Sequence, residues 1–251
     1  MSKNFKGTFG MIKIINNTTV EKITNQKKYN NKIKNETKIS KLSNILIKNY
    51  NIDLKIPKIY GMNLDFSKHS FIMDRVYPPR GKSRIQTCIF WRLDDTIYQE
   101  DWDTVKLNDL FENNQEYLKK FSYNLGLFHC ALINNGIVPW EMEIIYGHLY
   151  NNTDDQLFCC DFDKWGLIDK KDKFKCNIKG FKKIELYNLL IQECYPIPID
   201  KNNWNYFCKG MLNFTKKFGI KYSFEDILKM IDLCEKKYKV QNYIYDDLYS
   251  N

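Results

Sequence analysis

The stretch that decides the fold reads GIVPWEMEIIYG at residues 136–147, and Asp161-Phe162-Asp163 follows it. Its acidic part, Glu141-Met142-Glu143, lies twenty residues before that second acidic stretch, which closes an apolar run at 157–160. A phosphotransferase holds magnesium and orients a hydroxyl group with carboxylates placed where buried elements meet loops. The spacing therefore predicts the acidic groups of a phosphotransfer site, although a solvated pair at 141 and 143 without a role is an equal alternative.

The residues around this stretch predict a helical second part of the chain. A single apolar stripe is formed by residues that follow one another in steps of three or four: Leu118, Phe121, Leu125, Phe128 and Leu132. It indicates a helix that begins near Gln115 and ends at Asn134-Asn135-Gly136. Three more helices are expected at 180–194, 202–217 and 223–238, and Ser223 with Asp226 loosely matches a capping box at the start of the last one.

The first third of the chain is rich in strand patterns. We expect a hairpin of strands 11–15 and 18–23 around Asn16-Asn17, two residues that tolerate positive φ. A helix should follow at 31–49, and then a second strand pair at 56–61 and 70–76, stopped by Pro78-Pro79. Residues 80–113 are interpreted as an insertion, with one possible strand at 85–93.

The composition indicates a folded chain with an uneven charge. Hydrophobic residues make up 43% and aromatic residues 15% of 251 residues, and the net charge is +9. The first fifty residues hold eleven Lys and two Glu, so the whole excess of positive charge lies there. Such a region could favour nucleotide, RNA or another polyanion. The alternative is a solvated surface in a chain that uses Lys and Asn throughout.

The eight cysteines do not follow a metal or disulfide pattern. No C-x-x-C pair is present, and none of the three His has ligand spacing to a Cys pair. The cysteines at positions 130, 159, 160 and 234 fall at apolar positions, which predicts small buried thiols in a reducing compartment. The Met1–Asn4 start leads into no apolar run and no membrane-length run follows, so we expect a cytoplasmic protein.

The landmarks of the first third resemble the protein-kinase-like superfamily. Gly7-Thr8-Phe9-Gly10 is similar to the second half of a kinase glycine-rich loop, with Phe5 where the first glycine would stand. Lys22 lies where kinases carry the lysine that contacts the α- and β-phosphates, and Glu36 lies where its partner would be. Asp74 follows the strand that joins the two lobes in kinases. An exposed lysine is the alternative for Lys22.

The second part continues the resemblance with altered residues. Pro139-Trp140-Glu141 stands in place of His-Arg-Asp, Tyr146 in place of the metal-binding Asn, and Glu143 in place of a lysine that steadies the transferred phosphate. Asp161-Phe162-Asp163 keeps the magnesium-binding Asp and the Phe. Residues 136–147, Asp161-Phe162-Asp163 and Met73–Pro78 together form a sequence pattern that is similar to an uncharacterised kinase-like domain of unknown function in fungal proteins.

The resemblance implies an α+β, bilobal kinase-like fold. The N-lobe would span 1–77, with the hinge near 74–79, and a mainly helical C-lobe would span 78–251. ATP and Mg²⁺ would be the cofactors. The residues expected to bind the nucleotide are Gly7, Gly10, Lys22, Glu36 and Asp74. Asp161 and Glu143 would bind the metal, and Glu141 would be the catalytic residue. Three functions stay open: an atypical phosphotransferase, an inactive pseudokinase that binds a nucleotide or partner, and a polyanion- or RNA-binding module. No Ala-Pro-Glu follows Asp161, so an active enzyme would act on a small molecule or on an unconventionally docked substrate.

Overall fold

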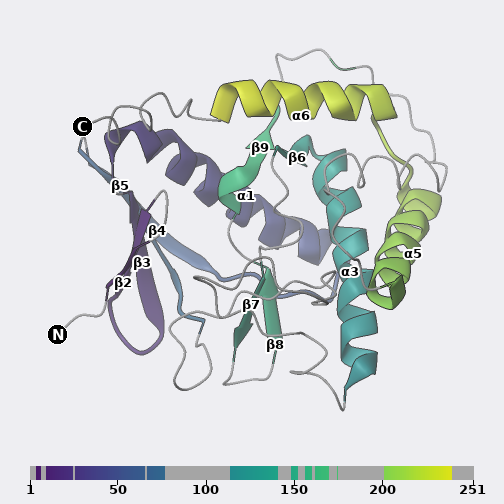
Figure 1. Ribbon diagram of the computed structural model, residues 1–251, viewed down its shortest axis with the longest axis horizontal. Coiled ribbons are helices and arrows are strands. Elements are labelled where there is room, and N and C mark those ends of the chain that lie inside the picture. The colour runs from purple at the N-terminus through teal and green to yellow at the C-terminus, as the bar shows by residue number, and fades with distance from the viewer. Residues whose placement is uncertain are drawn as a thin grey trace, which may run out of the picture.

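The structure is a computed structural model with an α+β arrangement (Figure 1). It describes residues 4–6, 10–24, 26–65, 67–76, 114–140, 148–151, 156–159, 162–169, 174 and 201–238. The strands are β1 (Asn4–Lys6), β2 (Gly10–Ile14), β3 (Thr19–Thr24), β4 (Ile59–Leu64), β5 (His69–Asp74), β6 (Ile137–Pro139), β7 (His148–Asn151), β8 (Gln156–Cys159) and β9 (Trp165–Leu167). The helices are α1 (Asn30–Asn49), α3 (Gln115–Asn134), α5 (Lys201–Phe218) and α6 (Phe224–Tyr238), with short 3-10 turns η1 (Lys27–Tyr29) and η2 (Phe162–Lys164).

The first five strands form one antiparallel sheet in the order β1-β2-β3-β5-β4. The predicted hairpin is therefore confirmed as β2 and β3. Its turn is built differently from the expectation, because Asn51 is the only non-glycine residue with positive φ in the described chain. Instead, Oδ1 of Asn16 accepts hydrogen bonds from the backbone N–H groups of Thr18 and Thr19, at 2.8 and 2.9 Å.

The second strand pair is confirmed with shifted bounds. Strand β5 agrees with the expectation, but β4 begins at Ile59 rather than at residue 56 and continues to Leu64. Residues 52–56 leave the sheet and enter the core instead, with Ile52, Leu54 and Ile56 all buried. Lys55 forms an isolated parallel bridge to Phe158, where the N–H of Cys159 donates to the Lys55 carbonyl at 2.9 Å. The alternating apolar residues at 52–56 therefore belong to the core and not to the sheet.

Helix α1 matches the predicted helix and is fastened to the sheet at its first residue. Oδ1 of Asn30 accepts a hydrogen bond from Oγ1 of Thr24 at 2.8 Å and from the N–H of His69 at 3.0 Å. Asn30 and Thr24 are buried. This small polar network connects the end of β3, the start of β5 and the start of α1, and so fixes where the helix begins to cross the sheet.

The predicted helices at 115–134, 202–217 and 223–238 are confirmed as α3, α5 and α6. The helix expected at 180–194 and the strand expected at 85–93 lie outside the described residues. Gly136 ends α3 with φ of 72°. The capping box is present, since the Asp226 N–H donates to Ser223 Oγ at 3.1 Å and the Ser223 N–H donates to Asp226 Oδ2 at 3.3 Å.

Helices α3 and α5 lie side by side, and both contribute many residues to the hydrophobic core (Figure 1). They meet at two buried glycines. A Cβ atom on Gly126 would lie 2.1 Å from the Phe207 carbonyl oxygen, and one on Gly210 would lie 2.0 Å from that of Tyr123. The two backbones therefore approach each other as closely as only glycine allows.

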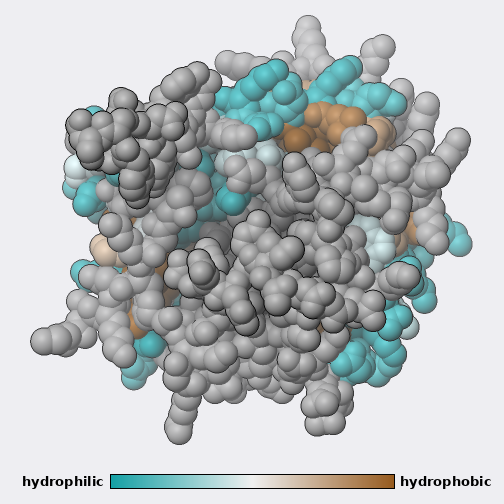
Figure 2. Space-filling model, in the orientation of Figure 1, coloured by the Kyte–Doolittle hydropathy of each residue, from teal (hydrophilic) through white to brown (hydrophobic). Residues whose placement is uncertain are grey.

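Helix α6 packs against the small β6–β9 sheet (Figure 1). Hydrophilic residues gather along the upper edge of Figure 2, where this helix lies. Its inner side is apolar, with Ile227, Met230 and Cys234 buried. None of the helices that the structure describes is both long and apolar enough to cross a membrane.

The cysteine expectation is confirmed for Cys130, Cys159 and Cys234, which are free and buried, as is Cys208. Cys160 lies outside the described residues. Burial raises the pKa of the Cys130 and Cys159 thiols far above their ordinary value of 9.0. These thiols are packing groups, because only the ionised form of a thiol is a strong nucleophile or metal ligand.

Candidate nucleotide-binding site

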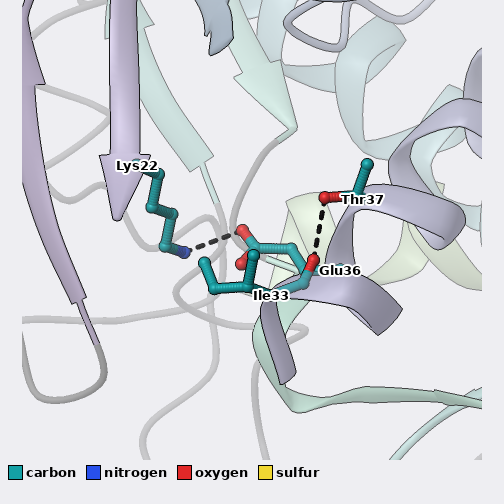
Figure 3. Close-up of polar contacts among 4 residues, drawn as sticks. All are labelled: Lys22, Ile33, Glu36 and Thr37. Carbon is teal, nitrogen blue, oxygen red and sulfur yellow. Dashed lines mark hydrogen bonds and ion pairs between the residues drawn. The ribbon is translucent and has the colours of Figure 1, made fainter. Parts of the chain in front are cut away.

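The site begins with an ion pair between the sheet and helix α1. Nζ of Lys22, on β3, lies 2.7 Å from Oε1 of Glu36, on α1 (Figure 3). Strand alternation puts Lys22 on the same face as the buried residues Val20 and Thr24, and this face is the one that α1 crosses. The side chains are only 12% and 4% exposed. The alternative of an exposed surface lysine is therefore wrong for Lys22.

Helix α1 presents Glu36 from its inner face. One turn earlier, the carbonyl of Ile33 accepts a hydrogen bond from Oγ1 of Thr37 at 2.8 Å (Figure 3). Ile33, Glu36, Thr37 and Ser40 are buried, whereas Lys34 and Lys38 between them are exposed. The helical period therefore holds the glutamate toward the sheet, where water screens its attraction to Lys22 less than at the surface.

The same inner face contacts the second half of the chain. Nδ2 of Asn35 donates a hydrogen bond of 2.6 Å to the backbone carbonyl of Trp165, on β9. Helix α1 also packs against η2, which contains Phe162 and Asp163. Both of these residues are buried. One helix thus holds the Lys22–Glu36 pair next to the second acidic stretch.

The β6–β9 ladder brings the residues before position 141 next to those after position 163. Pro139 pairs with Trp165 in this antiparallel ladder. The N–H of Trp140 then donates to the Lys164 carbonyl at 3.0 Å. The residue that precedes Glu141 in the chain is thus bonded to the residue that follows Asp163.

Several of the expected site residues lie outside the part of the chain that the structure describes. They are Gly7, Glu141, Glu143 and Asp161, and Tyr146 lies there as well. Among the described residues, no group of three or more His, Cys, Asp and Glu side chains could hold a metal ion. The roles proposed for these five residues stay predictions.

Gly10 is described, and its backbone approaches the neighbouring strand closely. It pairs with Thr24, and a Cβ atom at this position would lie 2.7 Å from the Ile23 carbonyl oxygen. This contact explains by itself why position 10 carries glycine. The expected approach of its backbone to phosphates stays a prediction beside that structural reason.

Asp74 uses its carboxylate within the sheet. It lies at the end of β5, where Oδ2 accepts from the Lys58 N–H at 2.8 Å and Oδ1 accepts from the Tyr60 hydroxyl at 2.5 Å. The hydrogen bond to Asp74 raises the pKa of Tyr60. These bonds hold the start of β4 against the end of β5. A nucleotide contact by Asp74 stays a prediction.

Two residues of the site were not singled out from the sequence, Lys32 and Asn35. Lys32 lies one turn before Glu36, is 5% exposed, and holds its Nζ 4.9 Å from the centre of the Trp140 ring. A lysine over an indole face is a cation–π contact. The sequence signal was a helix whose inner positions carry polar residues, which an amphipathic helix does not need for packing alone.

His129 is a core residue. It is 3% exposed and meets the rings of Trp165 and Phe207 edge-on, with centroid distances of 5.1 and 5.2 Å. Edge-to-face ring contacts of this kind stabilise a core. Its position between two large rings gives it a packing role.

In protein kinases, a lysine of the third strand pairs with a glutamate of the helix that follows it, and this pair must be in place for phosphoryl transfer. Here the third strand carries Lys22 and the next helix carries Glu36, in an antiparallel sheet that precedes a mainly helical part. The fold is kinase-like.

Comparisons with known proteins add little to this kinase-like assignment. No model of a known protein family matches the chain, and no curated protein matches it. Among solved structures, the kinase PK-1 of Cydia pomonella granulovirus is 15% identical over 92% of this chain and 93% of its own, with a TM-score of 0.41. At this TM-score the likeness carries no argument about binding or activity. Nothing in these comparisons supports the resemblance to the fungal domain.

Proposed function

We propose that this chain binds ATP with Mg²⁺ and transfers a phosphoryl group to a small molecule or to a substrate docked in an unconventional way. The observation that carries the proposal is the buried Lys22–Glu36 ion pair. A lysine held at this point of a kinase-like sheet can reach the α- and β-phosphates of a nucleotide while the glutamate fixes its direction. Burial strengthens both attractions.

The remaining roles follow the kinase-like pattern. Gly7 and Gly10 border the phosphates, and Asp74 lies near the lobe connection. Asp161 and Glu143 supply carboxylate oxygens, the ligands that Mg²⁺ prefers, and this metal neutralises the charge of the phosphates. Glu141 accepts the proton of the substrate hydroxyl. The hydrogen bond from the Trp140 N–H to the Lys164 carbonyl supports a common location for these carboxylates.

A nucleotide-binding pseudokinase is the second candidate, and two residue types favour it. Glu141 replaces the shorter catalytic Asp of kinases, and Tyr146 replaces the Asn that binds a metal. A misplacement of about 1 Å at a reacting group can lower a rate on the order of a hundredfold. The two candidates share nucleotide binding and differ in turnover.

The first test measures nucleotide binding by thermal shift with ATP and Mg²⁺. Saturation at about 100 times the dissociation constant should add about 2.7 kcal/mol to the free energy of unfolding. Lys22→Met should abolish the shift, because the α/β-phosphates lose their cation. Lys13→Met is the matched control, since Lys13 is an exposed lysine on the neighbouring strand β2 and should leave the shift unchanged.

Two further measurements separate the metal role and the turnover. Asp161→Ala should remove the magnesium-dependent part of the shift; an unchanged shift would exclude this residue as a metal ligand. Phosphate transfer from labelled ATP across a panel of small-molecule acceptors should occur with the wild type and be lost in Glu141→Gln. Binding without transfer to any acceptor would assign the pseudokinase function, and no shift at all with ATP, GTP or ADP would refute both.

A further inference from the structure

The solvent face of helix α1 carries a row of lysines. Lys34, Lys38, Lys41 and Lys48 are all exposed, and their spacing of four, three and seven residues places them along one side of the helix. We call these four residues the lysine ridge. With a rise of 1.5 Å per residue, the ridge extends over about 21 Å. Exposed Lys27 and Lys28, in η1, precede it.

Helix α1 itself supplies no carboxylate to the ridge. The only acidic residue of α1 is Glu36, which is buried on the opposite face and paired with Lys22. Among the described residues, no ion pair involves a ridge lysine. Several lysines of α3 and α6 do have carboxylate partners: Lys119 pairs with Glu116, Lys120 with Asp53, Lys236 with Asp232 and Lys237 with Asp169.

The ridge has a cost for the helix that carries it. Lys34 and Lys38 are four residues apart and Lys38 and Lys41 are three apart, so like charges face each other on adjacent turns. Like charges at this spacing destabilise a helix by about 0.2–0.5 kcal/mol per pair. An anion bound along the row would remove this repulsion.

We propose that the lysine ridge binds the phosphate backbone of a nucleic acid without reading its sequence. A nucleic-acid strand offers one phosphate about every 3.4 Å along the duplex axis, so a row of about 21 Å lies within reach of several phosphates. The ridge holds no Arg for bidentate contacts to bases and no aromatic side chain on which bases could stack. Contacts to the backbone alone are what such a surface can make.

A membrane surface is the competing partner, and the helix does not suit it. An interfacial helix inserts its apolar face between lipids. The apolar residues of α1 that would do this, among them Ile39 and Leu46, are buried in the core. The large apolar side chain exposed beside the ridge is that of Ile45.

The test measures binding of a fluorescein-labelled 20-base-pair RNA duplex and a 20-nucleotide single strand by anisotropy at several salt concentrations, without nucleotide. For the wild type, the logarithm of the binding constant should fall against the logarithm of salt with a slope of about −3 to −4, since each contacted phosphate adds about −0.9 in a duplex. Replacing the four ridge lysines by Gln should weaken binding at least tenfold and bring the slope close to zero.

The matched control removes the same charge elsewhere. Lys209, Lys216, Lys217 and Lys229 are exposed on α5 and α6, and their replacement by Gln should change the affinity less than threefold. An equal loss of RNA affinity in both variants would show that binding depends only on the net charge of the protein, and would overturn the proposal. So would binding to vesicles of anionic lipid in the absence of RNA binding. If the ridge variant does not fold by circular dichroism, Lys38→Gln alone should lower the slope by about one.

Discussion

At the scale of single residues, the buried thiols should make the stability of the protein depend on pH in the alkaline range. Cys130 and Cys159 lie in the core, and desolvation raises the pKa of both thiols above their ordinary value of 9.0. In the folded chain these thiols stay protonated in a pH range where the unfolded chain has already lost its thiol protons. Unfolding therefore releases protons in that range.

We expect the free energy of unfolding to fall as the pH rises above 9. A group whose pKa is higher in the folded state contributes stability that is fully present below the unfolded pKa and is lost above it. The loss is about 1.4 kcal/mol per pH unit for each such thiol. Urea unfolding of wild type and Cys159→Ala at pH 7, 9 and 10 measures it. The variant should lose less stability than the wild type between pH 9 and 10, and equal losses would contradict the prediction.

At the scale of elements, the crossing of α3 and α5 depends on two glycines. Gly126 and Gly210 each face a backbone carbonyl of the other helix, so a side chain at either position meets atoms that cannot rotate away. Glycine inside a helix costs about 1 kcal/mol relative to alanine. Two glycines in these helices cost about twice that amount. The close backbone contact between the two helices therefore contributes more stability than the two glycines cost.

Gly210→Ala should therefore destabilise the protein although alanine is the better helix former. The new Cβ would lie 2.0 Å from the Tyr123 carbonyl oxygen, and overpacking of this kind costs about 1–3 kcal/mol, which exceeds the propensity gain of about 1 kcal/mol. Chemical denaturation measures the difference. Gly61→Ala is the control: a Cβ there meets nothing within 4 Å, and we expect a change within about 0.5 kcal/mol. A Gly210→Ala variant as stable as the control would show that the helices can separate freely.

The elements that local pattern could predict are those whose buried side repeats regularly. Helix α3 is an example, because its apolar stripe steps by three and four residues until Gly136. Strand β4 shows the opposite case. Its apolar residues Tyr60, Met62 and Leu64 do alternate along the strand, but they are exposed, so the pattern does not mark a buried face. The alternation at 52–56, outside the sheet, is the one that enters the core beside β8.

For the candidate site, the sequence predicted the Lys22–Glu36 pair through a resemblance and not through local pattern. The contacts that surround it could not be predicted. The Asn35–Trp165 bond joins residues 130 positions apart in the chain, and nothing in either segment indicates the other. Contacts of this kind depend on the packing of the whole fold.

At the scale of the molecule, helix α1 joins the N-terminal sheet to the second part of the chain. It contacts β3 and β5 of the sheet and also η2, β9 and α3 of the second part. The sheet makes few other described contacts to the helical part, so the polar bond from Asn35 to the Trp165 carbonyl is one of the fixed points between them.

Asn35→Ala should make the unfolding of the N-terminal sheet and of the second part less cooperative. Loss of the buried bond should cost about 1–3 kcal/mol, because the carbonyl loses a partner away from water. All five Trp residues follow the N-terminal sheet in the chain, at 91, 102, 140, 165 and 204, so their fluorescence reports on the second part, and far-UV circular dichroism reports on both. In wild type the two urea transitions should coincide, and in the variant they should separate. Coincident transitions in the variant would mean that other contacts suffice.

Helix α1 also has a thermodynamic consequence that follows from its two faces. The inner face carries Glu36 and the outer face carries the lysine ridge, on one rigid body of 20 residues. Any rotation or sliding of that body changes both faces at once. Ligands at the two faces then share a coupling free energy, and this coupling is reciprocal. A polyanion that raises the affinity for ATP by a given factor must have its own affinity raised by ATP by the same factor.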